Sequence, residues 1–193
     1  MGLKGRLRRA LRATAREFDH ALTSFEPTSG PSTYPERMVS YYYIQALAKA
    51  LAPASVLLEL PVTGKRGKDN HIDAIIFNNR EVVVAEFKRA WTPSHWGDLA
   101  RDLVRLRGPV AREIRQGFTN NRRRRSYVLL GADCWYRETA NAWKSGSPAK
   151  RWNTPPPFLA AHRDYLRVFR EEGKDYDGYY FTWALIPFDE MAA

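Results

Sequence analysis

Residues 71–88 read HIDAIIFNNREVVVAEFK, two runs of apolar and β-branched residues separated by a short polar turn. Each run, 71–77 and 81–88, has the composition of a β-strand. Asn78 and Asn79 between them favour a tight hairpin. We therefore predict an antiparallel pair of strands here, and the remaining elements are placed outward from it.

The segments on both sides alternate between helical and strand-like patterns. Before the pair we expect a helix at 3–22, a loop at 26–35, a helix that opens near Pro35 and ends at Pro53, and a strand at 56–62. After it we expect a helix from about 92 to about 107, a strand at 126–132, a short helical stretch, a proline-rich linker at 148–157, a helix at 158–172 and a strand at 179–186. This order predicts an α/β fold with a central mixed sheet flanked by helices.

Three charged residues stand inside the two apolar strands. Glu86 and Lys88 lie two positions apart, so they project from the same face, and Asp73 interrupts the apolar run of the preceding strand. If Phe77 pairs with Arg80 across a two-residue turn, Asp73 and Glu86 become diagonal neighbours with Cβ atoms roughly 7 to 8 Å apart. A four-residue loop keeps both acids on one face, whereas a loop of odd length separates them.

Two carboxylates at this separation repel each other unless a cation or a proton intervenes. A hard divalent ion with oxygen ligands resolves the conflict, and Mg²⁺ prefers one or two carboxylates together with water and substrate phosphate. Such an ion activates water and stabilises charge on a phosphoryl oxygen, while Lys88 on the same face can orient the attacking water. The pattern predicts hydrolysis of phosphodiester bonds, with Mn²⁺ as an alternative ion.

The spacing of these residues resembles a known signature. Asp73, followed by twelve residues and then Glu86-Phe87-Lys88, is similar to the motif of the PD-(D/E)xK nuclease superfamily, although Ile72 stands where the family has proline. The resemblance covers about residues 35–132. It implies a restriction-endonuclease-like αβββαβ core and products that carry a 5′ phosphate and a 3′ hydroxyl.

The resemblance also implies roles for individual residues. Asp73 and Glu86 would bind Mg²⁺, the carbonyl of Phe87 would add a ligand, and Lys88 would assist the nucleophilic water. Many members bring a further glutamate from the first core helix, and Glu36 matches that place. Read without the family, Glu36 is equally well explained as a residue that favours a helix N-terminus.

The charge of the chain points to a polyanionic partner. Lys and Arg number 31 against 21 Asp and Glu, a net charge of +10, and the excess is concentrated in residues 1–16 and 101–125. We expect nucleic acid, DNA rather than RNA, as the partner. The candidate phosphate contacts are Arg8, Arg12, Arg101, Arg105, Arg122, Arg123, Arg124 and Arg125.

Several function classes are disfavoured, and others stay open. One cysteine excludes an internal disulfide, and no apolar run approaches the ~20 residues that cross a bilayer, so we expect a cytoplasmic protein without a membrane partner.

We expect a basic amphipathic helix at 1–25 that packs on a single nuclease-like domain at 26–193. The alternatives are an inactive nuclease fold that binds nucleic acid or protein, and a structural ion-pair network. A defence, toxin or mobile-element role, a homodimer and a regulatory protein partner are also open.

Overall fold

The computed structural model describes residues 1–25, 36–61, 71–89, 101–106, 117, 124–145, 161–169 and 178–191. The helices are α1 (Leu3–Phe25), α2 (Glu36–Leu51), α5 (Arg137–Ser145) and α6 (Phe188–Met191), and residues 101–106 are helical as well. The strands are β1 (Ser55–Pro61), β2 (His71–Phe77), β3 (Glu81–Arg89), β4 (Arg125–Cys134), β5 (Arg163–Phe169) and β6 (Tyr179–Pro187).

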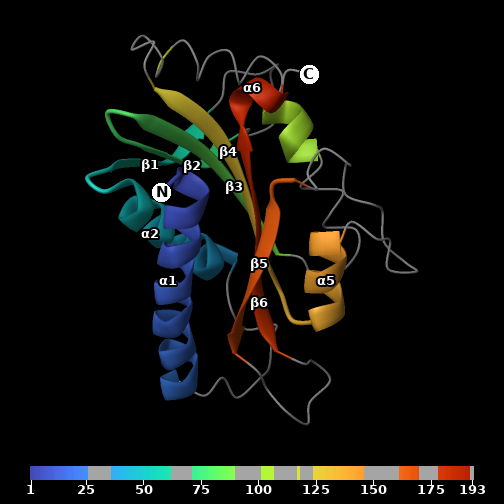
Figure 1. Cartoon of the computed structure of the whole chain (residues 1–193). Helices are drawn as coiled ribbons and strands as arrows, with labels where there is room; N and C mark the ends of the chain where they lie inside the picture. The colour runs from blue at the N-terminus through green and yellow to red at the C-terminus, as the bar shows by residue number, and fades with distance from the viewer. Residues whose placement is uncertain are drawn as a thin grey trace.

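The strands form one mixed sheet in the order β1-β2-β3-β4-β6-β5. The β3–β4 pair is parallel, and the other neighbours are antiparallel. A parallel pair needs a crossover connection, and residues 101–106 supply helical structure between β3 and β4. The predicted α/β class with a mixed sheet flanked by helices is confirmed (Figure 1).

The expected helix at 158–172 is wrong for residues 163–169, which form strand β5. This strand pairs antiparallel with β6, from Arg163↔Ala184 to Phe169↔Tyr179. The leucine, arginine and alanine residues in and around this segment favour a helix, but Tyr165 and Val168 favour a strand. Strand β6 provides the backbone groups with which the segment pairs. The backbone hydrogen bonds to β6 therefore override the local helical preference.

Two hydrophobic cores lie on opposite faces of the sheet. One packs the sheet against α1 and α2 and includes Leu7, Leu11 and Phe18 from α1. The other packs the opposite face against residues 101–106 and α5, through Leu103, Leu106 and Trp143 among others. Figure 1 shows α1 and α2 on one side of the twisted sheet and α5 on the other. The sheet is thus the middle layer of a three-layer arrangement.

The β2–β3 hairpin has a longer connection than expected. Phe77 pairs with Val82, not with Arg80, so four residues lie between the last paired residues of the hairpin in place of two. Asn78 explains the difference, because its N–H donates to the Glu81 carbonyl at 2.9 Å and its Oδ1 accepts from the backbone N–H groups of Arg80 and Glu81, both at 2.8 Å. The shift is by an even number of residues, so the faces on which the side chains project are unchanged.

Candidate active site

The structure brings Asp73 and Glu86 together on neighbouring interior strands. The β2–β3 register runs from Phe77↔Val82 to Ala74↔Ala85. Continued one residue beyond Ala74↔Ala85, the last pair of this ladder, the register would place Asp73 beside Glu86, in place of the diagonal position expected from the sequence. Directly opposed residues in an antiparallel pair share a face and have Cβ atoms roughly 5 Å apart. The charge of Asp73 raises the pKa of Glu86, so the two carboxylates lie near each other.

Asp73 is held in place by the neighbouring strand. Its Oδ2 accepts a hydrogen bond from the backbone N–H of Phe87 at 2.7 Å. The Phe87 side chain points to the other face of the sheet, into the core shared with α1 and α2, where its ring centroid lies 5.3 Å from that of Tyr43. Gly131 on β4 leaves room for that ring, since a Cβ there would meet Phe87 Cδ1 at 2.8 Å. Packing on one face thus supports the orientation of a carboxylate on the other.

The helical residues 101–106 add two charged groups to the site. Asp102 Oδ2 lies 3.3 Å from Lys88 Nζ, and Asp102 Oδ1 lies 3.3 Å from Arg105 Nη2. Arg105 Nη2 also forms a direct ion pair with Glu86 Oε1. Five charged side chains therefore form one cluster, with Glu86 1% exposed at its centre.

Asp102 was not singled out from the sequence, and Arg105 was expected only as a phosphate contact. A usable signal existed, because Asp102 and Arg105 are spaced i, i+3 on a predicted helix whose Leu103 and Leu106 must face the core. The residues on the edges of such an apolar stripe lie against the sheet. The spacing could thus have placed both residues beside the strand that carries Glu86.

Burial dominates the electrostatics of Glu86. Burial, with a smaller contribution from the nearby carboxylates of Asp73 and Asp102, raises the pKa of this carboxyl from 4.5 to about 8, while Arg105 and Lys88 oppose the shift. At neutral pH the group is therefore mostly protonated in the absence of another cation. A strongly raised carboxyl pKa beside charged partners is typical of functional sites.

The two flanking groups are shifted in the same direction. Burial raises the pKa of Asp73, although the Phe87 N–H and Lys88 stabilise its charged form. Burial alone would lower the pKa of Lys88, but the carboxylates of Asp102, Asp73 and Glu86 outweigh it, and the pKa rises. Lys88 is therefore a cation at neutral pH, suited to donating hydrogen bonds and offsetting negative charge but not to accepting a proton.

The carboxylates of Asp73 and Glu86 are the kind of ligand that a divalent cation prefers, but the described part of the chain does not assemble a complete metal site around them. Among the residues described, no three or more His, Cys, Asp or Glu side chains are grouped so as to hold a metal ion. Two neighbouring carboxylates nevertheless offer the oxygen ligands that Mg²⁺ prefers, and their mutual repulsion favours a cation. The Arg105 guanidinium contacts Oε1 of Glu86, so Arg105 would compete with a bound cation for that oxygen.

The other residues expected to hold the metal or substrate lie elsewhere or outside the described residues. Glu36 begins α2, and its side chain lies outside the described part of the chain, as do Arg122 and Arg123. Arg101 is exposed on the same helical segment as Arg105.

The remaining arginines expected to contact nucleic acid are remote from the acids. Arg8 and Arg12 belong to α1, which packs on the opposite face of the sheet, and Arg8 pairs with Asp164 at 3.4 Å. Arg124 and Arg125 lie at the start of β4, which by the parallel pairing is the Glu81 end of β3. The predicted phosphate contacts thus do not form one surface around Glu86.

No family model, no curated protein and no solved structure matches the chain. None of the helices in the described segments is long and apolar enough to cross a lipid bilayer. Any assignment of function therefore depends on the site itself.

Proposed function

We propose that this protein is a metal-dependent nuclease that hydrolyses phosphodiester bonds, in DNA rather than RNA, and that its sheet is a variant of the PD-(D/E)xK core. One observation carries the proposal: two carboxylates and an amine share a face of two interior strands, where burial of charge without a function is costly. The net charge of +10 supports a polyanionic substrate.

The charge state of each residue determines the role that we assign to it. Asp73 and Glu86 would hold Mg²⁺ or Mn²⁺, which supplies Lewis-acid stabilisation of negative charge on the phosphoryl group when bound. Lys88 is kept protonated by the surrounding carboxylates, so it would orient the attacking water and offset charge on the phosphate oxygens. Glu86 must lose its proton to serve as a ligand, so cation binding strengthens as the pH rises toward 8.

Arg105 and Asp102 would position these groups. In the structure Arg105 bridges Glu86 and Asp102, and Asp102 holds Lys88. Arg105 is 24% exposed at its side chain, so it can turn outward to a substrate phosphate when a cation takes its place on Glu86.

The direct test is cleavage of plasmid DNA, linear DNA and RNA by the purified chain, with Mg²⁺, with Mn²⁺ and with chelator. Glu86→Ala and Lys88→Ala are compared with Glu138→Ala and Lys144→Ala, matched changes at exposed positions of α5. We expect metal-dependent cleavage that the α5 variants retain and the site variants lose by at least about 100-fold. Equal cleavage by all five proteins would exclude this site.

A second candidate is a nuclease fold that binds nucleic acid without cutting it. The ion pairs of Arg105 with Glu86 and of Lys88 with Asp102 favour this candidate, because they satisfy the charges without any metal. It predicts DNA binding that weakens with salt, ignores Mg²⁺ and survives Glu86→Ala. The metal-dependent nuclease predicts that Mg²⁺ raises the free energy of unfolding of the wild type but not of Glu86→Gln.

A further inference from the structure

A second concave site lies at the end of the sheet where the β2–β3 hairpin turns. This hairpin pocket has a volume of about 750 Å³ and is lined by Arg6, residues 49–55, residues 77–81 and residues 124–125. Its walls come from α1, the end of α2, the start of β1, the hairpin and the start of β4. The volume lies within the range of small-molecule binding sites.

The hairpin pocket is separate from the candidate active site. Glu81 lines the pocket at the first residue of β3, and Glu86 lies five residues further along the same strand. Five residues of extended strand span about 17 Å. A ligand in this pocket therefore does not occupy the carboxylate cluster.

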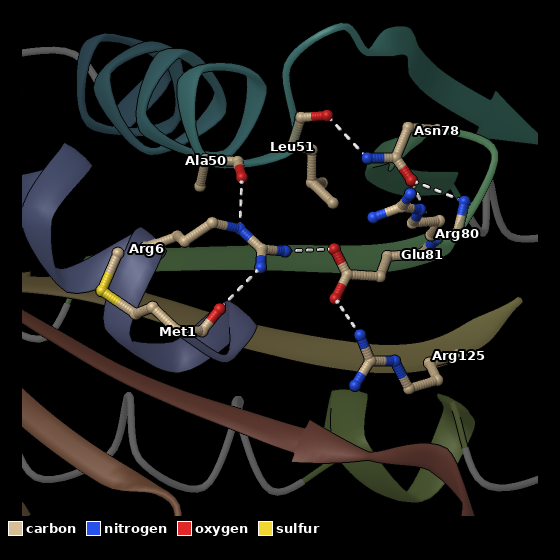
Figure 2. A network of polar contacts seen from close by, with 8 residues as sticks. All are labelled: Met1, Arg6, Ala50, Leu51, Asn78, Arg80, Glu81 and Arg125. Atoms are coloured by element: carbon tan, nitrogen blue, oxygen red, sulfur yellow. Dashed lines mark hydrogen bonds and ion pairs between the residues drawn. The ribbon is translucent and has the colours of Figure 1, made fainter.

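A buried carboxylate organises the pocket wall. Glu81 is 2% exposed and forms ion pairs with Arg6 through Oε2 and with Arg125 through Oε1, the latter at 3.1 Å. Arg6 also donates to the carbonyls of Ala50 at 2.9 Å and Met1 at 3.1 Å. Figure 2 shows Arg6 and Arg125 reaching Glu81 from different elements. Each nitrogen of the Arg6 guanidinium thus donates to a group within the protein.

The remaining positive charge faces the pocket with little acid to neutralise it. Five of the lining side chains are basic and only Glu81 is acidic. Arg80 is exposed and has no acidic partner among the described residues, and the Arg125 side chain is 64% exposed beyond its contact with Glu81. Lys49 is paired with Glu17 at 2.7 Å, and the Arg124 guanidinium lies over an aromatic ring. Arg80 and Arg125 are therefore the groups best placed to bind an anion.

A second part of the pocket wall is uncharged. Residues 50–54, at the end of α2 and the start of β1, read Ala-Leu-Ala-Pro-Ala, and Ala52 and Pro53 are exposed. A small inorganic anion would contact only the cationic wall. A ligand that uses both walls combines a phosphate with a neutral, partly apolar body.

We propose that the hairpin pocket binds a nucleotide through its phosphate, with Arg80 and Arg125 on the phosphate and the base or sugar against residues 50–54. The phosphomonoester can belong to a free nucleotide or to the 5′ end of a nucleic acid. Paired guanidinium groups bind phosphate strongly because several charge-assisted hydrogen bonds form at once. The proposal stands independently of any cleavage reaction.

The test is calorimetric titration of the full chain in chelator, so that metal-dependent chemistry plays no part. The probes are adenosine 5′-monophosphate, adenosine, inorganic phosphate, and one short oligonucleotide with and without a 5′ phosphate. We expect the monophosphate to bind at least tenfold more tightly than adenosine or inorganic phosphate. If the 5′-phosphorylated oligonucleotide binds more tightly than both the monophosphate and the same oligonucleotide without the phosphate, the source is a nucleic-acid end; otherwise the source is a free nucleotide.

Two variants test whether the monophosphate binds in the hairpin pocket. Arg80→Gln, which removes a side chain with no acidic partner among the described residues, should weaken binding of the monophosphate about tenfold. Arg167→Gln makes the same change at an exposed position of β5, at the far edge of the sheet, and should leave binding unchanged. Undetectable binding of every phosphorylated probe, equal binding of inorganic phosphate and monophosphate, or unaltered binding by Arg80→Gln would each overturn the proposal.

Discussion

Replacing Glu86 by glutamine should change how the stability of the protein depends on pH. In the folded chain the pKa of Glu86 is raised from 4.5 to about 8, mainly by burial. Between these two values the folded state holds a proton that the unfolded state has released. The stability associated with this proton is fully present below pH 4.5 and is lost as the pH rises through about 8.

The size of the effect follows from the shift. Each pH unit between the two pKa values corresponds to about 1.4 kcal/mol, so the full difference is on the order of 5 kcal/mol. Glutamine keeps the shape of the protonated acid and cannot ionise. We therefore expect Glu86→Gln to match the wild type near pH 4.5 and to exceed its free energy of unfolding by several kcal/mol at pH 9.

Urea unfolding followed by tryptophan fluorescence, at intervals from pH 4.5 to 9 and without divalent metal, measures this difference. Subtracting the Glu86→Gln curve from that of the wild type leaves the contribution of Glu86 together with its coupling to Asp73, whose pKa is raised in the same direction. Glu138→Gln, at an exposed position of α5, provides the matched control and should follow the wild type. Parallel curves for wild type and Glu86→Gln across this range would refute the electrostatic account of the site.

Three further predictions concern the cluster, the α1 contact and the core. Arg105→Met should reduce the free energy of unfolding by about 3 kcal/mol at pH 9 but by much less at pH 5, where Glu86 carries a proton, as urea unfolding at the two pH values can show. Arg6→Met should cost about 2 kcal/mol in the same assay, because Glu81 keeps only one guanidinium partner. Gly131→Ala should lower the stability by about 2 kcal/mol, measured by thermal unfolding, because the added Cβ overlaps an aromatic ring.

Much of the site could be predicted because it depends on neighbours along the chain. Strand alternation puts Glu86 and Lys88 on one face whatever the rest of the fold does. Asp73 joins them for any hairpin loop with an even number of residues, so the prediction survived an error of two residues in the turn. The four-residue connection itself followed from the side chain of Asn78, whose hydrogen bonds could not be read from its identity alone.

The contacts between distant segments could not be predicted in this way. Residues 163–169 carry a mixed local preference, and only the open edge of β6 made them a strand. The ion pairs of Arg105 with Glu86 and of Arg6 with Glu81 join residues 19 and 75 positions apart. No local pattern specifies such pairs.

The amino-acid sequence by itself determined two adjacent apolar strands that present Asp73, Glu86 and Lys88 together, since side-chain alternation and turn formation are properties of consecutive residues. The tertiary structure decided which groups surround them: Asp102 and Arg105 from residues 101–106, and the burial that raises the pKa of Glu86 to about 8. A pKa depends on the dielectric and the charges on every side of a group, and those sides are supplied by segments that meet only when the chain folds.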